Sequence, residues 1–134
     1  MTTSTYRVIY GDTDQMGVVY YANYLALFER GRCEYMRAHA IDYAALERAG
    51  RFLPVVEAHV KYRAPARFDD LVTIDAEVTA HSRVTLTFTY RITRGADLLA
   101  EGSTVHACMG REGKPTRLPG SLLQAAGLND KPGA

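Results

Sequence analysis

The segment RVTLTFTYRIT, residues 83–93, constrains the fold more than any other stretch of the sequence. Apolar side chains alternate in it with polar ones, at Val84, Leu86, Phe88, Tyr90 and Ile92. A period of two is expected of a β-strand that buries one face, while its other residues, here mainly threonine, face away from the core. The segment therefore predicts a sheet with one buried face.

Further strands are predicted along the chain. They lie at 5–10 (TYRVIY, ending at Gly11), 52–64 (FLPVVEAHVKYRA), 71–82 (LVTIDAEVTAHS) and 98–111 (LLAEGSTVHACMGR), with RGAD at 94–97 as a turn. Their β-branched and aromatic composition favours strands, and the short Gly-containing connections favour neighbouring strands that pair antiparallel.

Helical periodicity is confined to the first half of the chain. From about residue 21 to 39, apolar side chains recur at three- and four-residue spacing, which is typical of an amphipathic helix. A short second helix follows, with Asp42 as N-cap and Gly50 as the stop. One strand, a long helix and four more strands predict an α+β fold in which an antiparallel sheet packs on the helix. The uncovered sheet face and strand edges favour a homo-oligomer.

Length and composition exclude several classes of protein. The 134 residues suit one domain, expected over 1–134 with a flexible tail at 128–134. The net charge is +1 and the arginines form no basic stripe, so we do not expect nucleic acid as a partner. No run approaches the roughly 18 apolar residues of a membrane span, and we expect a soluble, cytoplasmic protein. Cys33 and Cys108 form no CxxC pair and are expected to be reduced and partly buried.

Asp12 and Asp14 lie in the loop before the long helix, and Gly17 allows a tight turn just after them. A helix start offers unpaired N–H groups and a partial positive charge, which suit an oxygen that becomes negative during a reaction. A carboxylate beside it could attack a carbonyl or activate water. This interpretation needs a helix that begins near Tyr21, because with a start one turn later Asn23 is a competent N-cap and would partly fill the donors.

Other interpretations stay open on spacing alone. Asp12 and Asp14 could be ordinary turn residues that bond nearby backbone, or two ligands for Mg²⁺. A cysteine nucleophile is conceivable at Cys33, which lies within the predicted helix without an obvious histidine partner. A serine hydrolase is disfavoured because no GxSxG segment is present. The serines are Ser4, Ser82, Ser103 and Ser121.

The segment YGDTDQMGVVYYANYLALFERGRCEYM (10–36) closely resembles the N-terminal signature of the hotdog-fold acyl-CoA thioesterases, in the branch of 4-hydroxybenzoyl-CoA thioesterase and the Tol-Pal-associated thioesterases. VKYRAPARFDDLVTI (60–74) and REGKPTRLP (111–119) are also similar to this family, so the resemblance covers most of residues 5–119. It implies a hotdog fold, a long central helix wrapped by a five-stranded antiparallel sheet, in a homodimer or homotetramer with active sites between subunits. It implies hydrolysis of a coenzyme A or acyl carrier protein thioester, without a cofactor or metal.

The resemblance also implies roles for single residues. Asp14 is implied as the catalytic carboxylate, either nucleophile or general base, and the backbone N–H of Tyr21 as the donor that polarises the thioester carbonyl. Gly17 makes the turn between them, and Asp12 is left as a turn residue. Some relatives carry histidine where this chain has Tyr21, so no imidazole role is expected there.

A second set of residues is expected to contact the substrate. Coenzyme A carries a 3′-phosphate and a pyrophosphate, so cations or backbone N–H groups are expected at the pocket entrance. The candidates, chosen by position and chemistry, are Tyr24, Glu57, His59, Tyr62, Arg63, Arg67, Ser82 and Arg83. The histidines show no metal-ligand spacing: His59 and His106 are expected to be hydrogen-bonded strand residues, and His39 and His81 lie at element ends. A non-enzymatic acyl-CoA-binding or scaffold protein on the same fold is the alternative, which the intact Asp14 disfavours.

Overall fold

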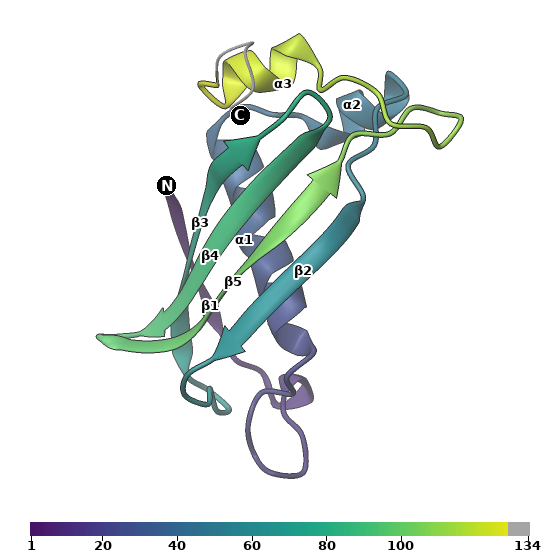
Figure 1. Ribbon diagram of the computed structural model, residues 1–134. Coiled ribbons are helices and arrows are strands. Elements are labelled where there is room, and N and C mark those ends of the chain that lie inside the picture. Colours follow the sequence, from purple (N-terminus) through teal and green to yellow (C-terminus); the bar gives the residue numbers. More distant parts are fainter. Residues whose placement is uncertain (129–134) are drawn as a thin grey trace.

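A five-stranded antiparallel sheet wraps one long helix in the computed structural model, which describes residues 1–128 (Figure 1). The strands are β1 (Thr2–Arg7), β2 (Val55–Tyr62), β3 (Leu71–His81), β4 (Thr85–Arg94) and β5 (Asp97–Ala107). The helices are α1 (Asn23–Ala38), α2 (Tyr43–Arg48) and α3 (Gly120–Ala125), with a short 3-10 helix, η1 (Tyr10–Asp12), after β1. The predicted α+β fold is confirmed.

The strands pair in the order β1-β3-β4-β5-β2, so β1 and β2 form the two edges of the sheet. The predicted turn between β4 and β5 is present as a two-residue loop at Gly95 and Ala96, closed by the pairing of Arg94 with Asp97. Gly95 adopts a φ of 58°, which a tight hairpin favours and which glycine adopts without strain.

The core lies between α1 and the inner face of the sheet. Leu86, Phe88, Tyr90 and Ile92 on β4 are each at most 1% exposed, and the threonines between them are half-buried on the opposite face. Phe28 of α1 stacks on Tyr90 with ring centroids 4.4 Å apart. The alternating apolar residues predicted from the sequence therefore form the surface on which α1 packs.

The two predicted helices are present with slightly shorter bounds. Asp42 caps α2 as expected, because its side chain accepts a hydrogen bond from the N–H of Ala45 at 3.1 Å. Gly50 ends this helix with a φ of 82°. His39 and His81 lie at the ends of α1 and β3, also as expected. No helix among the described residues is long and apolar enough to cross a membrane.

The boundaries of the first strand were predicted wrongly. β1 covers Thr2–Arg7, whereas the pattern favoured 5–10. The chain leaves the sheet after Val8 because the Asp12 carboxylate accepts hydrogen bonds from the N–H of Ile9 and the hydroxyl of Tyr6, which folds residues 9–12 into a turn. The other strand predictions hold to within four residues at each end: most ends are trimmed, and β4 and β5 each extend one residue beyond one predicted end.

The C-terminal segment holds one element that the pattern did not predict, the helix α3. Its Leu122 and Leu123 are buried against the core, and Leu128 is half-buried. The rest of the predicted flexible tail, 129–134, lies outside the described residues. Cys33 is half-buried and Cys108 is buried, both as free thiols.

A series of hydrogen-bonded polar side chains runs from α1 through the core. Arg32 donates to the hydroxyl of Tyr90 at 3.1 Å, this hydroxyl lies 2.6 Å from Oγ1 of Thr104, and Thr104 lies 2.8 Å from Nε2 of His106. The Nδ1 atom of His106 is 2.9 Å from the carbonyl oxygen of Leu53. His106 is 2% exposed, so it is a hydrogen-bonded strand residue, as the sequence suggested.

The burial of His106 makes the stability of the fold depend on pH. Burial lowers the pKa of its imidazole, the Leu53 carbonyl opposes this, and Arg32 lowers the pKa further. An unfolded histidine takes up a proton near pH 6.5, which the folded one resists. Stability is therefore expected to fall as pH drops below about 6.5, and His106→Gln should flatten this dependence. Urea unfolding at several pH values between about 7.5 and 5 measures it, and equal slopes for both proteins would contradict the assignment.

Candidate active site

Of the two aspartates singled out from the sequence, Asp12 ends η1 and Asp14 lies in the loop between η1 and α1. This loop closes on itself through the N–H of Asp14 to the carbonyl of Val18 at 2.9 Å and the N–H of Gly17 to the carbonyl of Asp14 at 3.0 Å. Gly17 has a φ of 80°, a left-handed conformation that costs other residues energy. The loop thus returns directly to the start of α1, at the end of the molecule opposite α2 and α3 (Figure 1).

Asp12 anchors this loop. Its carboxylate accepts from Tyr6 at 2.7 Å and from the N–H of Ile9 at 3.0 Å. Its carbonyl oxygen accepts from the N–H of Tyr20 and from the side-chain amide of Asn23, both at 2.9 Å. All of these partners are structural groups, so Asp12 holds the two ends of the loop together.

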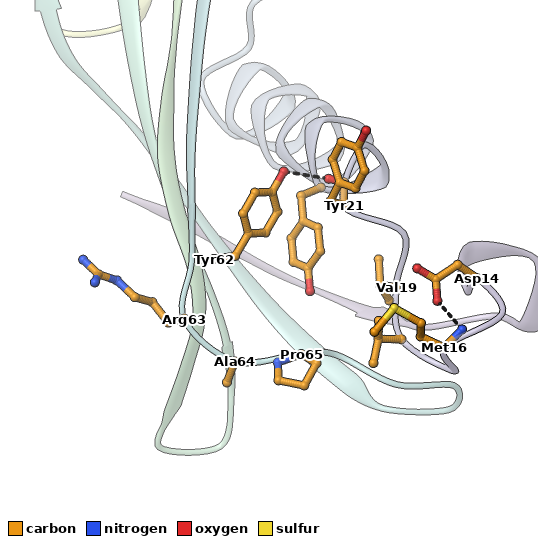
Figure 2. Close-up of a pocket in the computed structure, with 10 residues that line it drawn as sticks. Asp14, Met16, Val19, Tyr21, Tyr62, Arg63, Ala64 and Pro65 are labelled. Carbon is orange, nitrogen blue, oxygen red and sulfur yellow. Dashed lines mark hydrogen bonds between the residues drawn. The ribbon is translucent and has the colours of Figure 1, made fainter.

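Asp14 is half-buried and faces a cavity. One of its oxygens, Oδ1, accepts a hydrogen bond from the N–H of Met16 at 2.9 Å, as Figure 2 shows. Within residues 1–128, Oδ2 has no hydrogen-bond partner and is available to a ligand. The cavity has a volume of about 390 Å³ and is lined by Asp14, Met16, Val18, Val19, Tyr21, Tyr24, Tyr62, Arg63, Ala64 and Pro65.

The start of α1 forms one wall of the cavity, and its N–H groups are not capped by a side chain. Asn23, considered above as a competing N-cap, is the first helical residue and turns its side chain back to Asp12. The N-cap is Ala22, which offers no side-chain acceptor. Across the described part of the chain, no acceptor is recorded for the N–H groups of Tyr21 and Ala22. The helix dipole therefore reaches the cavity with unpaired donors.

Three tyrosines build the wall opposite the loop. The ring of Tyr62 meets that of Tyr24 edge-on at 5.2 Å and that of Tyr21 edge-on at 6.5 Å. Its hydroxyl donates to the carbonyl oxygen of Tyr21 at 2.9 Å (Figure 2). Arg63 borders the cavity, but its guanidinium points away from it (Figure 2) and pairs with Glu101 at 2.8 Å. The cavity is thus mainly apolar, with one carboxylate at its edge.

The remaining predicted contacts do not line this cavity within one protomer. Tyr62 and the half-buried Val60 of β2 face α1, so alternation places Glu57 and His59 on the other face of the sheet. Arg67 is exposed on the loop beside the cavity, with its N–H bonded to Asp70. Ser82 and Arg83 turn the chain between β3 and β4 at the far end of the sheet, where Ser82 bonds Thr85.

Five lining residues are not among the candidates named from the sequence: Met16, Val18, Val19, Ala64 and Pro65. Met16 and Ala64 lie two residues from Asp14 and Tyr62 respectively, so a search of the flanking residues would have found them. Their chemistry gave no signal, because apolar side chains that line a pocket look like any others in sequence.

Other chemistries receive no support from the described residues. No group of three or more histidine, cysteine, aspartate or glutamate side chains among residues 1–128 could hold a metal ion. Cys33 does not line the Asp14 cavity and faces two other hollows beside α1. One of these contains His106, but both ring nitrogens of that histidine are already hydrogen-bonded within the core.

Comparisons with known proteins find relatives over most of the chain. The family model of the thioesterase-like superfamily matches residues 8–126. The acyl-CoA thioester hydrolase YbgC of Escherichia coli is 40% identical over 119 residues, which are 87% of this chain and 89% of that protein. A hypothetical protein from Thermus thermophilus has a TM-score of 0.90 and 35% identity, over 95% of this chain and 98% of its own. A 1,4-dihydroxy-2-naphthoyl-CoA thioesterase from Synechocystis has a TM-score of 0.88 and 27% identity, over 97% and 98%.

Proposed function

Since the chain belongs to the thioesterase-like superfamily, we propose that it is an acyl-CoA thioesterase that hydrolyses a small acyl- or aroyl-CoA through Asp14. The observation that carries this proposal is the meeting of three features in one apolar cavity. These are a carboxylate oxygen without a partner, the uncapped start of α1, and a volume of about 390 Å³. Such a site can hold a thioester carbonyl between a nucleophile and hydrogen-bond donors.

Hydrolysis of the thioester can follow two routes, which differ in the role of Asp14. As general base, Asp14 takes a proton from water while the water oxygen bonds to the carbonyl carbon. As nucleophile, its oxygen bonds to that carbon directly and forms an anhydride that water then splits. In both, the carbonyl oxygen becomes negative near the N–H of Tyr21, the C–S bond breaks, and the thiolate leaves and is protonated. The products are a free acid and coenzyme A.

The phosphates of coenzyme A need cations at the cavity mouth. Arg63 borders the cavity and would have to turn its guanidinium toward it, and Arg67 is exposed on the adjacent loop. Arg63 would have to exchange its ion pair with Glu101 for a phosphate, or keep both. Ser82 and Arg83 can take part only from another protomer, because they lie between β3 and β4, at the end of the sheet opposite Tyr62. The cytoplasmic location expected from the sequence stays a prediction.

The edge strand β2 supports an oligomer. Seven of its eight residues are exposed, and Val55, Val56 and Tyr62 are 47%, 50% and 49% exposed. An exposed edge strand leaves backbone groups unpaired, and two copies can satisfy each other through a twofold axis. Tyr62 lines the cavity from this strand, so pairing at β2 would bring the partner beside the site.

We therefore expect light scattering to give two or four times the mass of one chain. Activity should fall when dilution separates the subunits, because a site completed at β2 needs its neighbour. Column-coupled light scattering and activity measured over a dilution series test this. A fully active monomer would contradict a site shared between subunits.

The proposed function is tested with a panel of thioesters of coenzyme A that carry short aliphatic, long aliphatic and aromatic acyl groups. Free thiol is followed spectroscopically with the wild-type protein, with and without EDTA. We expect release of thiol from at least one substrate, unchanged by EDTA, because the proposed chemistry uses no metal. Binding of acyl-CoA without any hydrolysis would instead support the scaffold alternative.

A further inference from the structure

Tyr62 connects the edge strand β2 to the start of α1. It is the last residue of β2, and its side chain crosses to the helix, where the hydroxyl donates to the carbonyl oxygen of Tyr21 at 2.9 Å (Figure 2). Burial and the neighbouring Tyr21 raise the pKa of Tyr62, so the phenol stays protonated and can donate. The two residues are 41 positions apart in the chain, so this is a tertiary contact.

The peptide groups on both sides of Tyr21 are held by hydrogen bonds. The group that carries the N–H of Tyr21 also carries the carbonyl of Tyr20, which accepts from the N–H of Asn23 at 2.8 Å. The next group carries the carbonyl of Tyr21, which accepts from Tyr62 at 2.9 Å and from the N–H of Tyr24 at 3.3 Å. The bond from Tyr62 is the shorter of the two. Without it, the long bond inside the first helical turn would be the one bond from residues 1–128 to the carbonyl of that peptide group.

We propose that Tyr62 is a positioning residue, whose hydroxyl holds the Tyr21 backbone so that the uncapped N–H groups of the helix start are aimed at the thioester carbonyl. This rests on the proposed function and goes beyond it, because it gives Tyr62 a task other than contact with the substrate. Donors that stabilise a developing negative charge act only when they are already aimed at it. A small misplacement is costly in rate.

The packing around Tyr62 supports this role. Its ring lies edge-on to Tyr24, whose own hydroxyl accepts from the N–H of Ala66 at 3.3 Å. Ala66 is fully buried, and its carbonyl accepts from the N–H of Val19 at 2.8 Å. The loop after β2 is therefore bonded both to the first turn of α1 and to the loop that carries Asp14. Tyr62 belongs to a set of contacts that fixes the catalytic loop and the helix start relative to each other.

The test is Tyr62→Phe, which removes the hydroxyl and keeps the ring. We expect kcat to fall about ten-fold with KM changed less than about two-fold, because one aimed hydrogen bond is lost and the cavity keeps its shape. Tyr43→Phe is the matched control. The Tyr43 hydroxyl accepts from the N–H of Leu53 at 3.0 Å, a comparable bond between a tyrosine and the backbone outside the Asp14 cavity. This variant should keep the kcat of the wild type.

The outcomes separate the inference from the proposed function. A rise in KM with kcat unchanged, or no change in either, would overturn the positioning role while leaving the thioesterase intact. If the wild type hydrolyses no thioester, the proposed function fails, and the inference is judged by amide hydrogen exchange. There, the N–H of Tyr24, which bonds to the same Tyr21 carbonyl as Tyr62, should exchange faster in Tyr62→Phe than in the wild type and in Tyr43→Phe. Equal exchange in all three proteins would overturn it.

Discussion

Replacing Asp14 with asparagine should lower kcat for thioester hydrolysis by about 10²–10⁴-fold, with little change in KM. The amide oxygen of asparagine can still accept the hydrogen bond that Met16 donates to Oδ1, so the loop keeps its shape. In asparagine, an amide nitrogen replaces the free, negatively charged oxygen. This nitrogen can neither remove a proton from water nor attack a carbonyl carbon. The change therefore affects the chemical step and leaves binding in place.

Asp12→Asn is the matched control, because it changes the same residue type two positions earlier in the same loop. The Asp12 carboxylate accepts from Tyr6 and from the N–H of Ile9 through a single oxygen, which an asparagine oxygen can replace. We expect its kcat to stay within a few-fold of the wild type. Equal losses in the two variants would mean that Asp14 acts through the loop structure and not through its charge.

A labelling experiment distinguishes the two routes open to Asp14. In a single turnover in ¹⁸O water, the anhydride route can leave label in the Asp14 carboxylate when water attacks the aspartyl carbonyl. The general-base route puts the label only in the released acid. Mass spectrometry of the peptide that contains Asp14 reads the result. Label in that peptide would establish the nucleophilic route, and its absence over many turnovers would favour the general base.

Local patterns in the sequence were enough to predict most of the fold. Alternation over 84–92 identified the strand that packs on α1, because a side chain that faces the core of a sheet recurs every second residue. Asp42 and Gly50 bounded α2 because capping depends on residues next to the helix end. The predicted bounds of β1 were wrong because the end of this strand depends on the hydrogen bonds of Asp12, which strand propensity does not include.

The candidate site, too, could be predicted only where its residues lie close together in the sequence. Asp14, Gly17 and Tyr21 lie within eight positions of one another, so the sequence could place them together before the helix, while the resemblance supplied the roles of Asp14 and Tyr21. The bond from Tyr62 to Tyr21 joins residues 41 positions apart, and only the fold reveals it. The predicted contacts of Glu57, His59, Ser82 and Arg83 stay untested, because their place relative to the cavity depends on a second protomer.

Gly102→Ala should destabilise the fold by about 3 kcal/mol or more, and lower the melting temperature by on the order of 10 °C. Gly102 lies in β5, paired with Tyr90 on one side and Val60 on the other, directly beneath α1. A Cβ atom there would lie 2.8 and 2.9 Å from ring carbons of Phe28 and would also collide with the carbonyl oxygen of His59. Phe28 is fully buried and stacked on Tyr90, so its ring cannot move without displacing a second ring.

Gly120→Ala is the control, since a Cβ at that position meets nothing within 4 Å and the first residue of α3 accepts alanine readily. It should leave the melting temperature unchanged or slightly raised. A second check pairs Gly102→Ala with Phe28→Leu, which makes room for the new methyl group. In urea unfolding, the double variant should lose less stability than the sum of the single variants, because the two residues share one contact. Strict additivity would contradict the steric explanation.

Gly102→Ala is also expected to affect the candidate active site, because Gly102 packs against the strand that carries Tyr62. The collision with His59 is with backbone, so it is relieved only if β2 moves away from β5, and Tyr62 is at the end of that strand. We therefore expect the folded fraction of Gly102→Ala to show a lower kcat as well, measured well below its melting temperature. A stable variant with the kcat of the wild type would show that β2 can shift without disturbing the Tyr62 contact, and that the helix start is held by α1 and its loop alone.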